Sequence, residues 1–233
     1  MRITRPLHRG VLLRRYKRFL ADVRLDDGRE LTVHCPNPGS MTGLAHEGVR
    51  VLVSDSQDPR RKLRMTLERV RPGRAWVGVN TLLPNTLVRE AIEAERIPAL
   101  AGYDDVRPEV VLEPGTRIDL RLTGDGRPPC WVEVKNATLR VGRAALFPDA
   151  VTERGARHLA ALHDVVSRGG RGVLVFVVNR GDCDRVSPAD AIDPAYGRAL
   201  RRAVCGGVEV LAHRARMRGA RTWLAEQVPV VLP

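Results

Sequence analysis

The 233-residue chain has a formal net charge of +12, with 43% hydrophobic and 28% charged residues, a composition that indicates a globular protein and excludes an extensively disordered one. No apolar run approaches the roughly 20 residues of a membrane-spanning helix, and the first ten residues, MRITRPLHRG, lack the apolar core of a signal peptide. The sequence therefore predicts a cytoplasmic protein without a membrane partner.

Residues 7–80 contain short segments rich in alternating apolar or β-branched residues, separated by turn sequences such as DDGRE and PGR. The predicted strands are LHRGVLLRRY, FLADVRLD, ELTVH, VRVLVS, LRMTLERV and AWVGV. This many short strands predicts a small closed β-barrel of the OB type over residues 1–81. Residues 34–44, HCPNPGSMTGL, are rich in Pro, Gly and small polar residues, so we expect a structured loop there.

Two basic clusters in this first domain are candidates for binding nucleic acid. Arg and Lys side chains interleaved with aromatic residues suit phosphate contact and base stacking. The candidate residues are Arg14, Arg15, Tyr16, Lys17, Arg18, Arg60, Arg61, Lys62 and Arg64. Residues 1–80 hold 17 Lys and Arg against 8 Asp and Glu, whereas residues 81–233 hold 22 against 19. The charge excess favours contact between this domain and DNA or RNA, and a solvated basic surface is the alternative.

The pattern changes after residue 81. Helical spacing over residues 85–96 follows Pro84, and three predicted strands follow at 109–112, 117–122 and 130–135. A helix capped by Thr152 is expected to end at Gly169 and Gly170, and VLVFVVN at 173–179 predicts a strand buried on both faces. A helix at 195–204, entered at Asp193, and a strand at 208–213 precede the terminal segment VPVVL. The order resembles the αβββαβ core of the PD-(D/E)xK nuclease-like fold and predicts such a domain over residues 82–233.

The segment from 117 to 139, RIDLRLTGDGRPPCWVEVKNATL, predicts a β-hairpin that carries the chemistry of this domain. Alternation places Glu133 and Lys135 on one face of their strand, and Asp119 lies on the paired strand. Asp119 and Glu133, with the carbonyl of Val134, are candidate ligands for Mg²⁺ or Mn²⁺, and Lys135 is a candidate catalytic residue beside the ion.

Lysine is rare in this chain, because only 3 of its 39 basic residues are Lys, and this favours a specific role for Lys135. An ordinary amphipathic hairpin with a surface ion pair is the alternative. Glu90, on the preceding helix, is a further candidate acid, with a solvent-facing helix charge as its alternative. Asp149, Glu153, Arg154 and His158 form another candidate surface near the start of the helix that follows Thr152. The cysteines and histidines show no spacing typical of a zinc site.

The chain also resembles the sugar fermentation stimulation protein (SfsA) family from about Pro6 to Leu232. The segments that carry the resemblance are RYKRFLADV, HCPNPGSMTG, RKLRMTLE, VNTLLPNTLVREAI, RIDL, VEVKNATL, FPDAVTERGARHL and GVEVLAHRARM. The resemblance implies an OB-like domain, a nuclease-like domain, DNA binding and a regulatory link to sugar (maltose) metabolism. The chain departs from the family pattern at Pro38, where Thr is usual, and at Ala137, where a larger apolar residue is usual.

Two functions remain open on the sequence. The first is a sequence-tolerant DNA-binding protein with a regulatory role in sugar metabolism. The second is a Mg²⁺- or Mn²⁺-dependent nuclease that acts on DNA or RNA, which the joint presence of Asp119, Glu133 and Lys135 favours. The resemblance to the family favours binding, so the sequence predicts DNA binding as the core function and the nuclease as the alternative.

Overall fold

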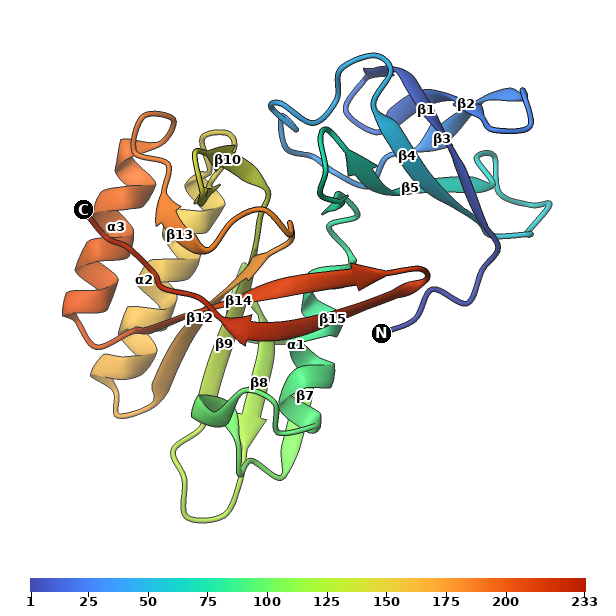
Figure 1. Cartoon of the computed structure of the whole chain (residues 1–233). Helices are drawn as coiled ribbons and strands as arrows, with labels where there is room; N and C mark the ends of the chain where they lie inside the picture. Colours follow the sequence, from blue (N-terminus) through green and yellow to red (C-terminus); the bar gives the residue numbers. More distant parts are fainter.

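A computed structural model describes residues 1–233, which form a β-barrel followed by an α/β domain (Figure 1). The barrel strands are β1 (Leu7–Tyr16), β2 (Leu20–Leu25), β3 (Glu30–His34), β4 (Arg50–Asp55) and β5 (Met65–Arg71), and the two-residue strand β6 (Val77–Gly78) follows them. The sheet order is β3-β2-β1-β4-β5-β6, and a parallel pairing of His34 with Thr66 joins β3 to β5. This pairing closes a five-stranded barrel, so the predicted OB fold is confirmed.

The barrel has its own apolar core because alternate residues of its strands point inwards. Leu12, Val23, Val33 and Leu67 are fully buried in one apolar cluster, whereas the intervening residues are mostly polar and face outwards. The predicted strands agree with the observed ones to within two residues, except that only Val77 and Gly78 of AWVGV pair as a strand.

The second domain begins with α1 (Leu83–Glu93), and a three-residue 3-10 turn follows it. The remaining elements are β7 (Asp105–Glu113), β8 (Thr116–Thr123), β9 (Cys130–Ala137), β10 (Leu139–Val141), β11 (Ala144–Phe147), α2 (Glu153–Ser167), β12 (Arg171–Val178), β13 (Arg185–Pro188), α3 (Pro194–Cys205), β14 (Glu209–Arg218) and β15 (Arg221–Gln227). Thr152 and Asp193 cap α2 and α3 by accepting from the backbone N–H groups of Gly155 and Tyr196. Both caps were predicted from the sequence.

The α/β domain has three layers around a six-stranded sheet of order β15-β14-β12-β9-β8-β7. Helix α1 packs on one face, where Leu87 and Val88 join Val132 and Val134 of β9 in a core. Helices α2 and α3 cover the other face. Strand β12 lies between β9 and β14 and pairs in parallel with both, and its residues 173–178 are all buried, as VLVFVVN predicted.

Four strands were not predicted. Strands β10, β11 and β13 form a small separate sheet, and β15 pairs with β14 as a hairpin that turns at Gly219, where φ is +55°. The terminal VPVVL contributes only an isolated bridge between Val186 and Val230. Strands of three or four residues carry too few alternations for a sequence signal, and β14–β15 is rich in Arg and Ala, which favour helices when taken alone.

Buried hydrogen bonds fix the two domains against each other. Arg69 of β5, only 4% exposed, donates to the carbonyl groups of Gly219 and Arg221 and to the hydroxyl of Thr222, at 2.7, 3.0 and 2.8 Å. The N–H of Gly78 donates to the carbonyl of Asn179 at 2.9 Å. In Figure 1 the β14–β15 hairpin, drawn in red, reaches from the sheet towards the barrel. The surfaces between the domains are therefore preformed.

None of the helices combines the length and the apolar character needed to cross a membrane.

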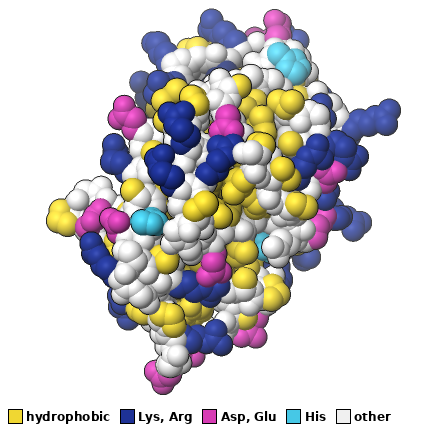
Figure 2. All heavy atoms as spheres, turned by 90° about the vertical axis from the view of Figure 1, so that its left-hand side faces the viewer, with side chains coloured by type: hydrophobic (Ala, Val, Ile, Leu, Met, Phe, Trp, Pro, Cys, Tyr) yellow, Lys and Arg dark blue, Asp and Glu magenta, His cyan; other side chains and the backbone are white.

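Lys and Arg side chains are spread over the upper half of the face shown in Figure 2.

Candidate metal centre and nucleic-acid interface

The carboxylate of Asp119 lies where β8 and β9 separate. The paired residues of the two strands run from Leu122 with Cys130 to Leu120 with Val132. At the next residue of β8, Asp119, the contact with β9 is made by the side chain and not by the backbone. Its Oδ2 accepts from the N–H of Val134 at 2.8 Å, and its Oδ1 accepts from the side-chain amide of Asn85 at 2.7 Å. One carboxylate thus joins α1, β8 and β9 at a single point.

Glu133 is 2% exposed, and its side chain lies on the face of β9 opposite the one that carries Val132 and Val134. Its Oε1 accepts hydrogen bonds from the ammonium group of Lys135 and from Nδ1 of His158 on α2, each at 2.5 Å. Its Oε2 is buried and has no hydrogen-bond partner. The predicted alternation, with Glu133 and Lys135 on one face, is confirmed.

His158 holds Glu133 through one defined nitrogen. The guanidinium of Arg154 donates to Nε2 of the imidazole at 3.3 Å, so the ring donates to Glu133 through Nδ1. His158 is itself 5% exposed. Lys135 and His158 both donate to Oε1 of Glu133, so only its Oε2 is free to bind another partner.

The pKa values of Asp119 and Glu133 are shifted in opposite directions. Burial, and then the neighbouring charge of Glu133, raise the pKa of Asp119 to about 6. Burial also opposes ionisation of Glu133, but the hydrogen bond from His158 and the charge of Lys135 outweigh it and hold the pKa of Glu133 below its ordinary value. A second positive charge near Asp119 would relieve its unfavourable ionisation.

These observations fit a hard divalent cation. Asp119 and Glu133 supply carboxylate oxygens, and the orphaned Oε2 of Glu133 is a buried acceptor that protein groups leave unsatisfied. No group of three or more His, Cys, Asp and Glu side chains is arranged to hold a metal ion. Backbone carbonyls and water would therefore have to complete the coordination, an arrangement that suits Mg²⁺.

The remaining predicted residues of this centre have other contacts. Val134 supplies its N–H to Asp119, and its carbonyl remains a predicted ligand. Glu90 pairs with the amino group of Met1 at 2.5 Å, and the side chain by which α1 reaches Asp119 is Asn85 instead. Sequence reasoning missed the roles of Asn85 and His158, although both stand near the start of predicted helices.

Residues 35–44, the CPNPGSMTGL loop, lie between the two domains. Arg15 of β1 donates to the carbonyl groups of Asn37, Gly39 and Ser40 at 2.7, 2.9 and 3.1 Å. From the other side, Asp149 accepts from the backbone N–H of Met41 at 3.1 Å. A Cβ added at Gly39 would lie 2.5 Å from that carboxylate, so this close approach requires glycine.

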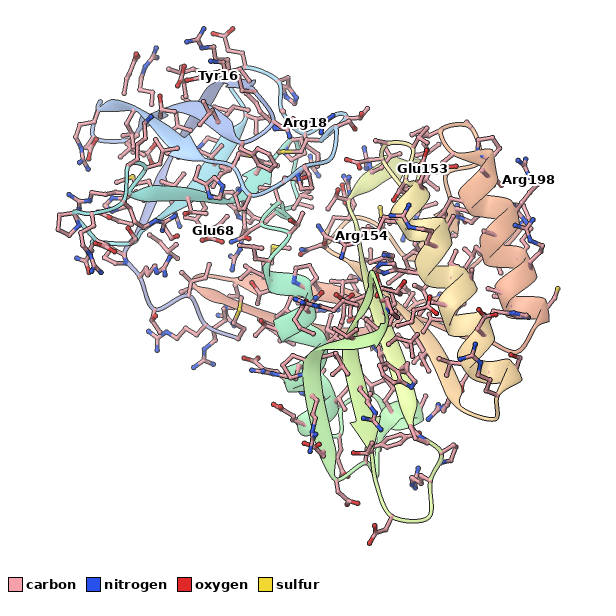
Figure 3. The ribbon with its side chains drawn as sticks, turned by 180° about the vertical axis from the view of Figure 1, so that it is seen from behind. Tyr16, Arg18, Glu68, Glu153, Arg154 and Arg198 are labelled. Atoms are coloured by element: carbon pink, nitrogen blue, oxygen red, sulfur yellow. The ribbon has the colours of Figure 1, made fainter.

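A hollow of about 310 Å³ lies beside this loop, lined by Asn37 and Gly39 of the barrel and by Asn136, Thr138 and Thr152 of the α/β domain. Thr152 caps α2, and His158 of that helix contacts Glu133, so the hollow adjoins the start of the helix that reaches the candidate metal centre. Figure 3 shows Arg18 on the side of the barrel nearest the α/β domain and Arg154 on the opposing side.

The first predicted basic cluster spans the end of β1 and the β1–β2 turn, and the second lies in the β4–β5 loop; these two loops bind ligands in many OB domains. Arg14, Arg60 and Arg64 are paired with Asp22, Asp58 and Asp55. Tyr16 donates its hydroxyl to Asp22. Lys17, Arg18, Arg61 and Lys62 form no ion pair or side-chain hydrogen bond and are the cluster members available to an anion.

The β1–β2 turn also carries an aromatic ring, that of Phe19. Phe19 is 45% exposed, and its ring centroid lies 6.5 Å from that of His34 on β3. Burial, and then the positive charge of Arg61, lower the pKa of His34. The exposed ring of Phe19, next to Lys17 and Arg18 in the same turn, suits stacking of an unpaired base.

Replacing Arg15 by Ala is expected to lower the free energy of unfolding by about 1–3 kcal/mol, because the loop carbonyls lose a charged donor. The matched substitution Arg18→Ala, at an exposed residue without a partner, is expected to change it by less than about 0.5 kcal/mol. Urea unfolding of both variants measures the difference. Equal stabilities would show that Arg15 does not support the loop.

Comparison with known proteins identifies relatives over the whole chain. Residues 82–221 match the sequence model described as "Sugar fermentation stimulation protein RE domain", and residues 13–79 match "SfsA N-terminal OB domain". A sugar fermentation stimulation protein homolog of Geobacter sulfurreducens is 55% identical over 231 residues, covering 99% of each chain. A homolog of Pelobacter propionicus is 57% identical over 228 residues, covering 97% of this chain and 98% of its own.

A solved structure, that of Pyrococcus furiosus SfsA in complex with Ca²⁺, superposes with a TM-score of 0.90 at 25% identity, covering 99% of this chain and 98% of that one. The similarity therefore extends over both domains and their relative arrangement.

Proposed function

The chain belongs to the sugar fermentation stimulation protein family, and we propose that it binds nucleic acid and hydrolyses phosphodiester bonds with a divalent cation held by Asp119 and Glu133. The observation that carries the proposal is the buried Oε2 of Glu133, which has no donor although Lys135 and His158 both donate to the other oxygen. An orphaned buried carboxylate oxygen is unfavourable unless an ion or water completes it.

The cation would be held by Asp119, Glu133 and the carbonyl of Val134, and Mg²⁺ or Mn²⁺ suits these oxygen ligands. The Pyrococcus furiosus relative was solved with Ca²⁺, another hard cation that takes oxygen ligands. Such an ion, when bound, polarises a phosphate and lowers the pKa of a bound water.

The protein groups around the ion have separate roles in this proposal. His158 and Lys135 fix Oε1 of Glu133, and Asn85 with the N–H of Val134 fixes Asp119. The ammonium of Lys135, 13% exposed, lies close enough to Glu133 to neutralise negative charge that develops on a phosphate beside it.

The nucleic acid would contact the barrel through the four unpaired cations, which are Lys17, Arg18, Arg61 and Lys62. The β1–β2 turn that carries Lys17 and Arg18 lies next to the loop that Arg15 holds at the domain junction. A strand bound there would continue into the hollow lined by Asn37, Asn136 and Thr152, at the start of the helix that carries His158.

Binding is expected to weaken by about 10²-fold or more between 50 and 200 mM salt, because each phosphate contact releases counterions. Fluorescence anisotropy with labelled single-stranded and duplex DNA measures the dependence. An affinity independent of salt would contradict the assignment of the basic clusters to phosphate contact.

Hydrolysis is tested by incubating end-labelled single- and double-stranded DNA and RNA with the protein and Mg²⁺, Mn²⁺ or EDTA. We expect cleavage with Mn²⁺ or Mg²⁺ and none with EDTA. Retained binding without cleavage of any substrate would contradict the proposal and favour its alternative.

That alternative is a DNA-binding protein without nuclease activity, with a regulatory role in sugar (maltose) metabolism. The observation in its favour is the ammonium of Lys135, which already neutralises Glu133, together with the absence of a three-residue ligand cluster. In this case the α/β domain would extend the binding surface of the barrel.

A further inference from the structure

Two hollows, of about 620 and 520 Å³, adjoin on the surface where the barrel meets the β14–β15 hairpin. They share Arg74, Ala75 and Gly181 in their walls, so they form one continuous groove, here called the arginine groove. Its lining includes no residue of the candidate metal centre and none of the two basic clusters described above. The groove therefore requires a separate explanation.

The groove has a strong positive charge. Six arginines line it, namely Arg74, Arg140, Arg180, Arg214, Arg216 and Arg218. Two acids neutralise part of this charge: Asp182 pairs with Arg180 and Arg140, and Glu226 pairs with Arg214 and Arg216. The guanidinium groups of Arg74 and Arg218 are exposed and contact no acid or hydrogen-bond acceptor, so the groove retains cations for an anionic ligand.

Two of the three tryptophans of the chain also line the groove, one from each domain. Trp76 follows β5, and Trp223 lies on β15; both are half-buried. Arg71 stacks over Trp76, with its guanidinium carbon 5.9 Å from the ring centroid. Flat rings beside unpaired cations are the combination that binds bases and phosphates of an unpaired strand.

The walls are held in place although they belong to different domains. Arg69 is bonded to the turn of the β14–β15 hairpin, and Val77, next to Trp76, forms a bridge with Arg180. A preformed groove binds with less loss of conformational entropy than one that must be ordered. Each hollow is within the range of about 300–1,000 Å³ that holds a small organic ligand, so together they have room for more than one nucleotide.

From charge, aromatic lining and rigidity we infer that the arginine groove binds a single-stranded segment of nucleic acid, with bases on Trp76 and Trp223 and phosphates on Arg74 and Arg218. The inference rests on the proposed nucleic-acid binding and adds a second surface to it. Duplex DNA fits less well, because its bases are stacked internally and cannot reach the rings. A strand held there continues the bound nucleic acid beyond the barrel loops.

The test compares the double variant Arg74→Glu/Arg218→Glu with the control Arg107→Glu/Arg168→Glu, which changes the net charge equally at exposed residues outside the groove and the basic clusters. Anisotropy with a labelled single-stranded oligonucleotide is expected to show about 10-fold or greater weakening for the groove variant relative to the control. The same comparison with a duplex is expected to show a smaller loss. An equal loss for the duplex overturns the assignment to single strands.

Tryptophan fluorescence provides a second readout that does not depend on the charge reversal. In a Trp131→Phe background, only the two groove tryptophans emit, and the oligonucleotide is expected to quench them with the midpoint seen in anisotropy. No quenching, together with equal affinity of groove and control variants, overturns the inference. If Lys17→Ala/Arg18→Ala still weakens binding in that case, the proposed function stands, whereas no binding by the unmodified protein overturns both.

Discussion

Glu133→Gln is expected to lower cation-dependent cleavage of nucleic acid by about 10³-fold, because the amide keeps the size of the side chain but loses the charge that attracts the cation. The substitution also places an amide against Lys135 and His158, which both donate to Oε1 in the native protein. Cleavage of end-labelled DNA and RNA with Mn²⁺ measures the effect. The same variant should retain salt-sensitive binding through the barrel.

Two controls make this result specific. Glu47→Gln, at an exposed residue without side-chain partners, should cleave like the native protein. Thermal unfolding with and without Mn²⁺ should show stabilisation of the native protein, about 2.7 kcal/mol at 100 times the dissociation constant, and no stabilisation of Glu133→Gln. Equal cleavage by Glu133→Gln and native protein would instead identify a contaminating nuclease or a different active site.

Most of the fold could be predicted because its signals are local. The alternation in LHRGVLLRRY predicts β1 over the same residues that form it, and the alternation across RIDLRL and WVEVK predicts the β8–β9 hairpin. The four missed strands depend on tertiary partners: β11 pairs with β13, which lies about forty residues later, and β15 is identified only by its pairing with β14. No local pattern encodes these contacts.

Of the residues at the candidate site, Asp119, Glu133 and Lys135 could be predicted from the sequence. Strand alternation identifies Glu133 and Lys135, but the contact of His158 with Glu133 depends on how α2 packs across the sheet. For Arg15 the sequence predicts a contact that the structure replaces with another. Its sequence context predicts a contact with nucleic acid, whereas its guanidinium donates to three carbonyl groups of a neighbouring loop. A basic residue next to an aromatic one does not reveal whether its partner is a phosphate or the chain itself.

Asp119→Asn is expected to stabilise the cation-free protein at pH 8 while removing its response to Mn²⁺. The pKa of Asp119 is raised from its ordinary value of 3.8 to about 6, so its contribution to folding is fully present below pH 4 and is lost as pH rises through 6. A shift of this size corresponds to about 3 kcal/mol at most, and partial exposure reduces the expected gain to about 1–2 kcal/mol. Asparagine keeps an oxygen for the N–H of Val134, and the amide of Asn85 can rotate to accept from it.

Urea unfolding of both proteins in EDTA at pH 5, 6, 7 and 8 measures this gain as the difference between the two free energies. The difference should grow in favour of the Asp119→Asn protein as pH rises, and saturating Mn²⁺ should reverse it by stabilising only the native protein. A difference that does not change with pH would show that Asp119 ionises without cost in the fold. The expected outcome has a structural reason: an ionised Asp119 beside buried Glu133 is unfavourable for folding, and the cation proposed for these two carboxylates would offset that repulsion.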